Sequence, residues 1–347
     1  MKIAVIGGGL IGQERLDALK KIIEISRLPL EISMVIDPDK SRLEKIFEKY
    51  KCPVSSNLED AFLAKPDWIF ICTPHEYVVD IARACFVQNC NVLIEKPLGR
   101  SLNECNEILA MKPQNTRLAV GFNYRFYSGI RKAIQDALGG RFGKIISVNM
   151  VLGHGNAPGM EKTWKLDPVK CGGGAMIDPG IHLLDLVLCL SNGSIDVMQG
   201  ANWSGFWDTG IEEEVHVIMK DSLGTIFNVQ ASLNRWRSNF RLEINGVDGY
   251  GVVEGRGRSY GPQSYKVGKR WGWQSGLNQA DSEELLIDSE PSNDSFLHET
   301  ATLLGIPLPG LEFESDQLNV CNQLQAQQAM SLLDSCRKSL NLPTEVA

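Results

Sequence analysis

An aspartate and a histidine, Asp178 and His182, stand four residues apart where the sequence predicts the start of a helix. Residues at positions i and i+4 share one helical face, so both side chains are expected to point the same way. The imidazole has a pKa suited to proton transfer near neutrality. The pair therefore predicts acid–base chemistry. Pro179, however, suits the first position of a helix, which would make Asp178 its N-cap.

A lysine, Lys96, follows the apolar run Val92–Ile94, which predicts a strand. The carboxyl ends of parallel strands form the edge where open α/β sheets bind ligands. A lysine at that edge stabilises a developing alkoxide, or moves a proton if burial lowers its pKa. The rigid Pro97 beside it favours this function over the alternative that Lys96 is simply a solvated surface lysine.

The first apolar run, Ile3–Ile6, leads into Gly7, Gly9 and Gly12, which satisfy the pattern G-x-G-x-x-G. Glycines at these positions permit a tight turn, close approach to a pyrophosphate and close helix–strand packing, with the anion at the helix N-terminus. Because the motif follows a predicted strand and opens a predicted helix, it indicates a dinucleotide site rather than a simple turn.

A second predicted strand, Ile32–Ile36, ends at Asp37, where such a fold places the acidic residue that binds the adenosine ribose. A carboxylate there repels a 2′-phosphate, so NAD is expected and NADP is less favoured. Two alternatives stay open. Asp37 belongs to a turn before a helix, or Lys40 or Arg42 receives a phosphate.

Four motifs together resemble those of the Gfo/Idh/MocA family, named after glucose–fructose oxidoreductase, inositol dehydrogenase and rhizopine catabolism. They are the glycine turn, Thr73-Pro74, Glu95-Lys96-Pro97 and the glycine-rich run 172–185, which contains Asp178 and His182. Their order and spacing cover about the first 190 residues. The resemblance implies a Rossmann domain followed by an α+β domain with a large, mainly antiparallel sheet.

The resemblance also implies roles for individual residues. Lys96 would touch the reacting hydroxyl, His182 would be the acid–base catalyst, and Asp178 would contact substrate or lysine. Tyr124 and Arg125 would face the substrate, unless Asn123 simply caps a helix there. The residues expected to bind cofactor are Gly7, Gly9, Leu10, Ile11, Gly12, Asp37, Thr73, Pro74, His75, Glu95 and Lys96.

One departure from the family is Val78, which stands where many members carry a histidine, so contacts of that helix are not transferred. The implied activity is NAD-dependent oxidation or reduction of a secondary alcohol or ketone in a sugar, cyclitol or sugar derivative. Two alternatives remain. One is a non-catalytic NAD-binding sensor, and the other is a lyase or hydrolase that uses NAD as a transient oxidant.

The elements that must position these residues divide into two patterns. Residues 1–121 alternate short apolar runs with helical stretches, which predicts a doubly wound parallel sheet. Besides the runs above, strands are expected at Trp68–Cys72 and Leu118–Val120. The helical period predicts helices that include Lys40–Tyr50, Leu102–Met111, Tyr124–Leu138 and Asp294–Leu304. Residues 122–347 carry longer alternating runs, typical of an antiparallel sheet, and end in a helix at about 315–340. Apolar residues on both faces of these runs, together with the family resemblance, predict a homodimer or homotetramer through this sheet.

Residues 255–290 show neither the helical nor the strand period and are expected to form a long loop. Its arginines and tryptophans would either clamp a phosphorylated, carboxylated or nucleotide-linked sugar or form a solvated loop or subunit contact. These residues are Arg256, Arg258, Arg270, Trp271 and Trp273.

The composition limits the partners of the chain. Its 347 residues carry 42 acidic and 35 basic side chains, a formal net charge of −7 that opposes nucleic-acid binding. Nine cysteines without a C-x-x-C pair indicate reduced thiols and a cytoplasmic protein. No apolar run approaches a membrane span, and no histidine or cysteine spacing predicts a metal site.

Overall fold

The computed structural model describes residues 1–26, 28–269, 285–290, 294–308 and 318–346. Contacts divide the chain into two compact units. The first comprises Met1–Asn123 and Asp294–Met330, and the second comprises Tyr124–Asn293 and Ser331–Ala347. The first boundary lies two residues beyond the predicted one. Assigning all of residues 122–347 to the second domain was wrong for Asp294–Met330.

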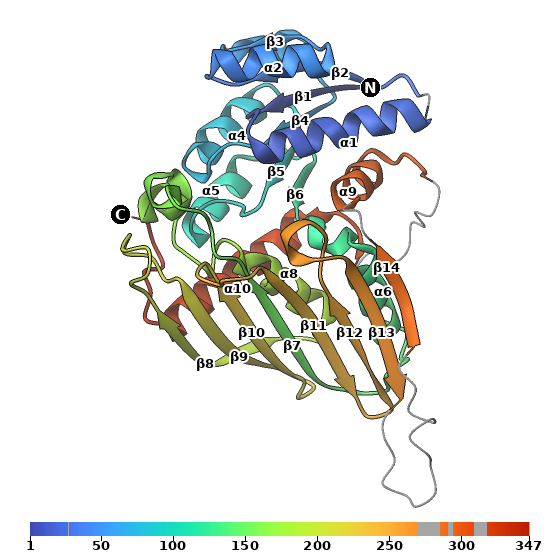
Figure 1. The fold of residues 1–347 in the computed structure, drawn as a ribbon. Coiled ribbons are helices and arrows are strands. Elements are labelled where there is room, and N and C mark those ends of the chain that lie inside the picture. Colours follow the sequence, from blue (N-terminus) through green and yellow to red (C-terminus); the bar gives the residue numbers. More distant parts are fainter. Residues whose placement is uncertain (27, 270–284, 291–293, 309–317, 347) are drawn as a thin grey trace, which may run out of the picture. The chain divides into compact units, whose positions relative to one another are not determined.

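The first unit is built on a seven-stranded sheet in the order β15-β6-β5-β4-β1-β2-β3 (Figure 1). Its strands are parallel, except that β15 runs antiparallel to β6. The predicted strands are largely buried, as in a sheet covered on both faces, whereas β3 and β15 are too short to show a period. The strands are β1 (Lys2–Ile6), β2 (Glu31–Ile36), β3 (Val54–Ser55), β4 (Trp68–Ile71), β5 (Asn91–Glu95), β6 (Leu118–Gly121) and β15 (Cys321–Asn322).

Helices connect the parallel strands, and two of them begin at capping side chains. Asp39 accepts hydrogen bonds from the N–H groups of Ser41 and Arg42, and Ser101 accepts one from Glu104. These caps explain why α2 and α5 have the predicted bounds. The elements are α1 (Leu10–Ser26), α2 (Lys40–Tyr50), α3 (Glu59–Leu63), η1 (His75–Tyr77), α4 (Val78–Val87) and α5 (Leu102–Met111).

A late helix, α9 (Ser295–Leu304), packs against α1 within the first unit. Its Phe296 and Leu297 belong to the same buried apolar cluster as Leu19 and Ile22 of α1. Removing this apolar surface from water holds the segment in the first unit, although it follows the strands of the second. Periodicity predicted the helix but not the surface on which it packs.

The second unit contains an eight-stranded sheet in the order β14-β13-β12-β11-β7-β10-β9-β8. Its neighbours are antiparallel, except for the parallel pair β7 and β10. The α+β prediction with a mainly antiparallel sheet is therefore confirmed. The strands are β7 (Ile145–Gly153), β8 (Ile195–Trp203), β9 (Glu214–Asp221), β10 (Ile226–Ser232), β11 (Asn239–Gly246), β12 (Gly249–Glu254), β13 (Gln263–Lys269) and β14 (Leu285–Glu290).

The expectation of one long loop over 255–290 was wrong in part. Residues Gln263–Lys269 form β13, which pairs with β12 and with β14. Its Tyr265 and Val267 face the core, so a strand pattern is present but short. Residues 270–284, which include Arg270, Trp271 and Trp273, lie outside the described part of the chain.

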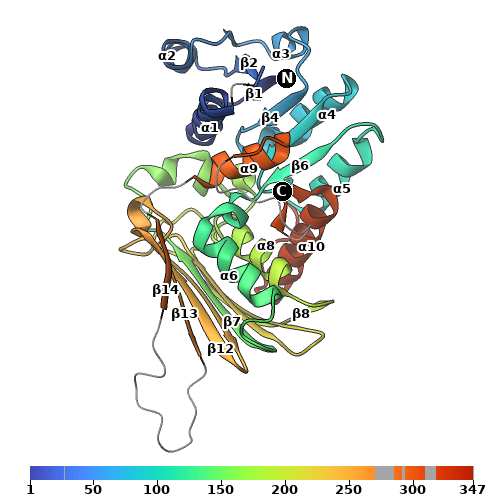
Figure 2. The same ribbon diagram turned by 90° about the vertical axis from the view of Figure 1, so that its right-hand side faces the viewer.

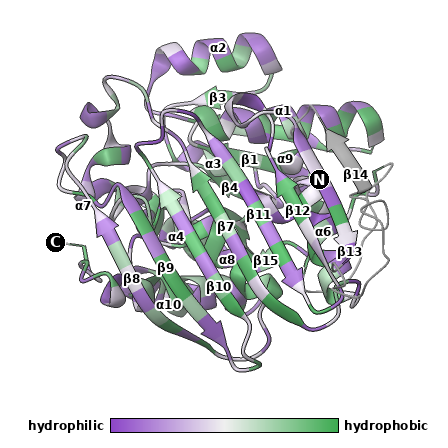
Figure 3. Ribbon diagram, turned by 60° about the horizontal axis from the view of Figure 1, so that its bottom comes forward, coloured by the Kyte–Doolittle hydropathy of each residue, from purple (hydrophilic) through white to green (hydrophobic). Residues whose placement is uncertain are grey.

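Helices α6 and α8 cover one face of this sheet and leave the other face open (Figures 2 and 3). The predicted helix from Tyr124 to Leu138 is split into η2 and α6, and the C-terminal helix begins later than predicted. The remaining elements are η2 (Asn123–Phe126), α6 (Ser128–Leu138), η3 (Met160–Lys162), η4 (Trp164–Leu166), α7 (Pro168–Cys171), α8 (Gly180–Leu190), η5 (Arg258–Tyr260) and α10 (Gln323–Ser339).

Three further observations concern the described residues. None of their helices is long and apolar enough to cross a membrane. No group of three or more His, Cys, Asp and Glu side chains among them is arranged to hold a metal ion. The nine cysteines, all in this part of the chain, form no disulfide, and each except Cys72 is buried.

Candidate functional site

The glycine turn after β1 leaves space where a phosphate would approach. A Cβ on Gly7, whose φ is +97°, would lie 2.5 Å from the carbonyl oxygen of Cys72, and one on Gly12 would lie 1.9 Å from that of Gly7. A Cβ on Gly9 would meet no atom within 4 Å. Gly7 and Gly12 are thus required by packing, whereas Gly9 borders open space at the N-terminus of α1. An anion there is stabilised by backbone N–H groups and the helix dipole.

Asp37 is buried at the end of β2 and is held by several donors. Its Oδ2 accepts a hydrogen bond from Gly8 N at 2.7 Å, and its Oδ1 accepts one from Asp39 N at 2.9 Å. Arg42 Nη1 lies 2.8 and 2.9 Å from the two oxygens. The carboxylate therefore sits beside the glycine turn, as predicted, but a partly exposed guanidinium already neutralises it.

Glu95 takes part in an internal ion network. Arg15, a residue that the sequence analysis missed, is fully buried in α1, and its Nε donates to Glu95 Oε1 at 2.7 Å. Arg15 Nη2 also donates to Glu299 Oε2 at 2.5 Å, and Nη1 to Thr300 Oγ1 at 3.2 Å. The carboxylate of Glu95 therefore joins β5 to α1 through Arg15, and its predicted cofactor contact stays a prediction. A charged residue in an otherwise apolar helix face was the available signal.

The other predicted cofactor residues of the first unit follow β4 and β5 at the edge of the glycine turn. Thr73 Oγ1 is shielded from solvent and has no hydrogen-bond partner in the described chain. His75 is buried, and Lys96 is half-buried directly after β5. An orphaned hydroxyl, an open Gly9 and a helix N-terminus without acidic residues in its first turn fit a dinucleotide.

In the second unit, Glu212 holds the glycine-rich loop that precedes α8. Its buried carboxylate accepts hydrogen bonds from Gly174 N and Met176 N, both at 3.0 Å. The carbonyl of Glu212 accepts a third from Ala175 N at 2.7 Å. Burial raises the pKa of Glu212, and the amide donors oppose that rise. The sequence analysis missed this residue, whose signal is an acid two residues before the strand β9.

Asp178 leaves this loop just before α8, but it does not cap the helix. The N-cap position is Pro179, whose side chain makes no capping hydrogen bond. Lys165 Nζ lies 3.9 Å from Asp178 Oδ2, and the carboxylate is about one-fifth exposed. The N-cap position is thus Pro179 rather than the predicted Asp178. The predicted contact of Asp178 with a substrate stays a prediction.

His182 is buried in the first turn of α8 and lies against an aromatic ring. Its imidazole stacks on Tyr124, with ring centroids 3.9 Å apart and an interplanar angle of 16°. Tyr124 in turn makes edge contacts with Tyr127 and Phe240. Burial raises the pKa of the Tyr124 phenol, so this ring is neutral beside the histidine.

Arg125 does not share the site predicted for it. It is 1% exposed, and its Nε donates to Asp185 Oδ2 at 2.8 Å while Nη2 donates to Oδ1 at 2.5 Å. A bidentate pair of this kind satisfies both charges inside the unit. The predicted substrate contact of Arg125 is thus corrected to an internal ion pair between η2 and α8.

Arg256 lies in the loop between β12 and η5, as predicted, and packs against the aromatic cluster. Its Nη1 donates to the Tyr127 hydroxyl at 3.0 Å. The guanidinium carbon lies 3.7 Å from the ring centroid of Tyr260 and 5.2 Å from that of Tyr124. Arg258, by contrast, is exposed.

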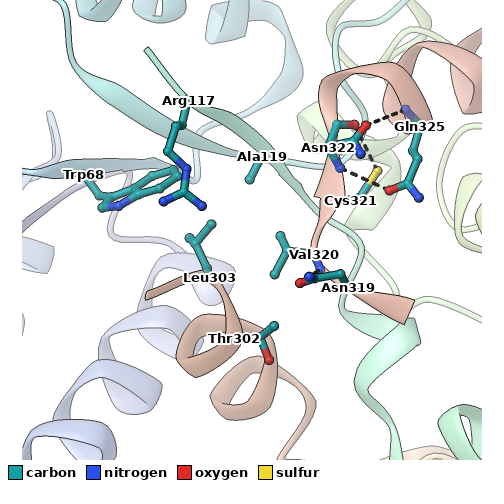
Figure 4. A pocket seen from close by; sticks show the side chains of 10 residues that line it. All are labelled: Trp68, Arg117, Ala119, Thr302, Leu303, Asn319, Val320, Cys321, Asn322 and Gln325. Atoms are coloured by element: carbon teal, nitrogen blue, oxygen red, sulfur yellow. Dashed lines mark hydrogen bonds between the residues drawn. The ribbon is translucent and has the colours of Figure 1, made fainter. Parts of the chain in front are cut away.

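A pocket of about 540 Å³ lies at the opposite edge of the first sheet, near the amino ends of β4 and β6 (Figure 4). The Arg117 guanidinium covers the ring of Trp68 at 5.0 Å. Asn322 and Gln325 use their side chains to cap α10, since each accepts a hydrogen bond from the backbone N–H of the other. These amides serve the helix end, and the pocket is remote from the glycine turn.

Comparison with known proteins agrees with both units. Residues 1–122 match the model of an oxidoreductase family with an NAD-binding Rossmann fold, and residues 129–251 match the GFO/IDH/MocA C-terminal domain. The chain is 26% identical over 194 residues to D-glucoside 3-dehydrogenase of Escherichia coli (strain K12), covering 54% of this chain and 53% of that protein. It is 28% identical over 192 residues to glucose-6-phosphate 3-dehydrogenase of Bacillus subtilis (strain 168), covering 54% and 52%. The matches thus span about half the length of these relatives.

Solved structures extend the similarity of fold to nearly the whole chain. Levoglucosan dehydrogenase in complex with NADH and L-sorbose has a TM-score of 0.79 at 16% identity, with 98% of this chain and 97% of that chain covered. Aldose-aldose oxidoreductase from Caulobacter crescentus has a TM-score of 0.78 at 15% identity, with the same coverage. At such identities the likeness concerns the fold alone.

Proposed function

Because the chain belongs to the Gfo/Idh/MocA family of oxidoreductases, we propose that it is an NAD-dependent dehydrogenase or reductase. Its substrate would be a secondary alcohol or ketone of a sugar, cyclitol or sugar derivative. The observation that carries the proposal is the open space at Gly9 beside the buried carboxylate of Asp37, in a chain whose second unit presents His182 and Asp178. The curated relatives named above act on sugars, which supports this substrate class.

The proposed roles follow from the chemistry of each side chain. The bound cofactor supplies or accepts a hydride. His182 exchanges a proton with the reacting hydroxyl, and stacking on Tyr124 restricts the rotation of its imidazole. The Lys96 ammonium stabilises the developing alkoxide or takes part in the proton transfer. Asp178 accepts a hydrogen bond from a substrate hydroxyl.

For the cofactor, we propose NAD in preference to NADP. Asp37 presents a buried carboxylate next to the glycine turn, where a 2′-phosphate would be repelled. Arg42 moderates this repulsion, since it neutralises the carboxylate. Calorimetry with NADH and NADPH tests the proposal, and tighter binding of NADPH would contradict it.

The activity itself is tested by incubating the purified protein with NAD and a panel of sugars and cyclitols while NADH is measured. Accumulation of NADH with one class of substrate supports a dehydrogenase. Substrate turnover without net NADH would instead identify a lyase or hydrolase that uses NAD transiently. Cofactor binding without any turnover, in either direction of the reaction, would identify a sensor.

We also propose a homodimer or homotetramer formed through the open face of the second sheet. The register of β8, β9 and β10 places Trp203, Ile218 and Ile226 on this face, each more than two-fifths exposed. Exposed apolar side chains on a sheet favour burial against another subunit. Sedimentation at micromolar concentration is expected to show an oligomer and Ile218→Asp to weaken it, whereas a monomer in the parent protein would refute the proposal. A cytoplasmic location stays a prediction.

A further inference from the structure

Arg256 carries a positive charge with an incomplete set of partners. The guanidinium is half-buried, and its Nε is shielded from solvent without a hydrogen-bond acceptor in the described chain. Its contacts are aromatic: the Tyr127 hydroxyl at 3.0 Å and the ring faces of Tyr260 and Tyr124. A guanidinium offers five N–H donors, so donors are left for a further acceptor.

Other buried arginines of the protein show what normally balances such a charge. Arg15 lies against Glu95 and Glu299, and Arg125 forms a bidentate pair with Asp185. In the described chain, Arg256 forms no ion pair with a carboxylate. The nearest acidic residue in sequence, Glu254, pairs with Arg241 instead. Ring faces attract a cation, but more weakly than a desolvated carboxylate does.

The position of Arg256 connects it to the proposed reaction. Tyr124 lies between the two functional groups, with its ring 3.9 Å from that of His182 and 5.2 Å from the Arg256 guanidinium carbon. One sugar-sized molecule can therefore present a hydroxyl to His182 and another substituent to Arg256. The charge of Asp178 acts on Tyr124 and Tyr260, the two rings beside Arg256, while its carboxylate lies 3.9 Å from Lys165 Nζ.

We propose that Arg256 binds an anionic group on the substrate, so that the enzyme acts on sugar phosphates or sugar acids rather than on neutral sugars. The inference rests on the proposed function, because it names the substrate class of the same site. Phosphate and carboxylate oxygens both match the donors of a guanidinium, and the arms of the experiment below separate them. The rings of Tyr124 and Tyr260 would contact the guanidinium and restrict its rotation, so that its remaining N–H donors face the anion.

The test compares matched substrates in the presence of NAD. For each of several hexoses, the neutral sugar, its 6-phosphate and its uronate are assayed for kcat/KM. One anionic form is expected to exceed the neutral sugar at least tenfold, and the form that does so identifies phosphate or carboxylate as the ligand. Equal or better turnover of the neutral sugar overturns the proposal.

Variants then assign the preference to one side chain. Arg256→Met is expected to abolish the anionic preference, Arg256→Lys to keep part of it, and Arg258→Met, an exposed arginine two residues further on, to leave it unchanged. Raising the ionic strength is expected to weaken the binding of anionic substrates to the parent protein but not to Arg256→Met. A preference that survives Arg256→Met overturns the proposal.

Failure of the proposed dehydrogenase activity is distinguished by binding. If no sugar reduces NAD, the same neutral and anionic pairs are titrated by calorimetry against the parent protein and Arg256→Met. Tighter binding of the anionic member that depends on Arg256 supports the anion site while refuting the dehydrogenase. Absence of that difference overturns the anion site.

Discussion

The glycine-turn edge of the first unit and the His182 cluster of the second hold their functional groups by different means. Around the glycine turn, each buried charge meets an opposite charge, as in the Arg15 network and the pair of Asp37 with Arg42. Around His182, Arg125 pairs with Asp185, but the imidazole lies against a tyrosine ring and Arg256 has aromatic partners only. The buried charges named at the glycine-turn edge are thus paired with opposite charges, whereas the His182 cluster contains a guanidinium, that of Arg256, without a carboxylate partner in the described chain.

The largest expected effect is on kcat, and it distinguishes residues that take part in the reaction from residues that only support the fold. Lys96→Ala and His182→Ala should each lower kcat by roughly 10²–10⁴-fold, the usual worth of a positioned acid or base, while NADH affinity stays close to that of the parent. Their combination should be less than additive, because either change disables the shared proton path. Full turnover by His182→Ala with the identified substrate would reduce His182 to a packing residue. Calorimetry with NADH serves as the control for folding and cofactor binding.

The next effect compares the stability contributions of Arg15 and Arg256. Arg15→Met leaves Glu95 and Glu299 buried without their partner and should cost about 3–5 kcal/mol of unfolding free energy. Arg256→Met leaves no carboxylate behind and should cost about 1–2 kcal/mol, the worth of its ring contacts. Urea unfolding of both variants measures the difference. Equal losses of unfolding free energy would show that ion pairing contributes as much to stability around His182 as at the glycine-turn edge.

A smaller effect is expected on the preference for NADH over NADPH at the glycine-turn edge. Asp37→Ala removes the acceptor that we propose for the ribose and also releases Arg42 from its ion pair. The ratio of NADH to NADPH affinity should fall by roughly tenfold, about the worth of one charge-assisted hydrogen bond. Arg42→Ala provides the matched control, because it leaves the carboxylate in place and should strengthen the NADH preference. An unchanged ratio in Asp37→Ala would remove Asp37 from the ribose site.

The smallest effect is on the pH dependence of stability, and it is expected to be equal for one buried thiol in each unit. Burial raises the pKa of Cys105 in the first unit and of Cys336 in the second from 9.0 to about 12. Above pH 9 the unfolded thiol therefore loses its proton while the folded one keeps it, so stability falls as pH rises toward 12. Each thiol contributes a slope of about 1.4 kcal/mol per pH unit. Cys105→Ala and Cys336→Ala should each reduce the slope of urea stability against pH by that amount, and an unchanged slope would contradict the assignment.

Local pattern was enough for much of the fold. Apolar runs predicted β1, β2, β4, β5 and β6, and the helical period predicted the bounds of α2 and α5. These features depend on residues within a few positions of one another, so sequence alone carries them. The pairing of strands and the packing of helices that are distant in sequence could not be predicted from local pattern. The edge strand β8 and the strand β13 depend on neighbouring strands, and α9 depends on α1 for the apolar surface that it covers.

The same division holds for the candidate site. The sequence by itself determined the glycine turn, the family and the positions of Lys96, Asp178 and His182, because each is a short motif with local geometry. Only the tertiary structure decided how the charges are used. It turned Arg125 toward Asp185 and Glu95 toward Arg15, and it placed Arg256 among tyrosines. The reason is physical: the partner of a buried charge is chosen by three-dimensional proximity, between residues that stand up to 284 positions apart in the chain.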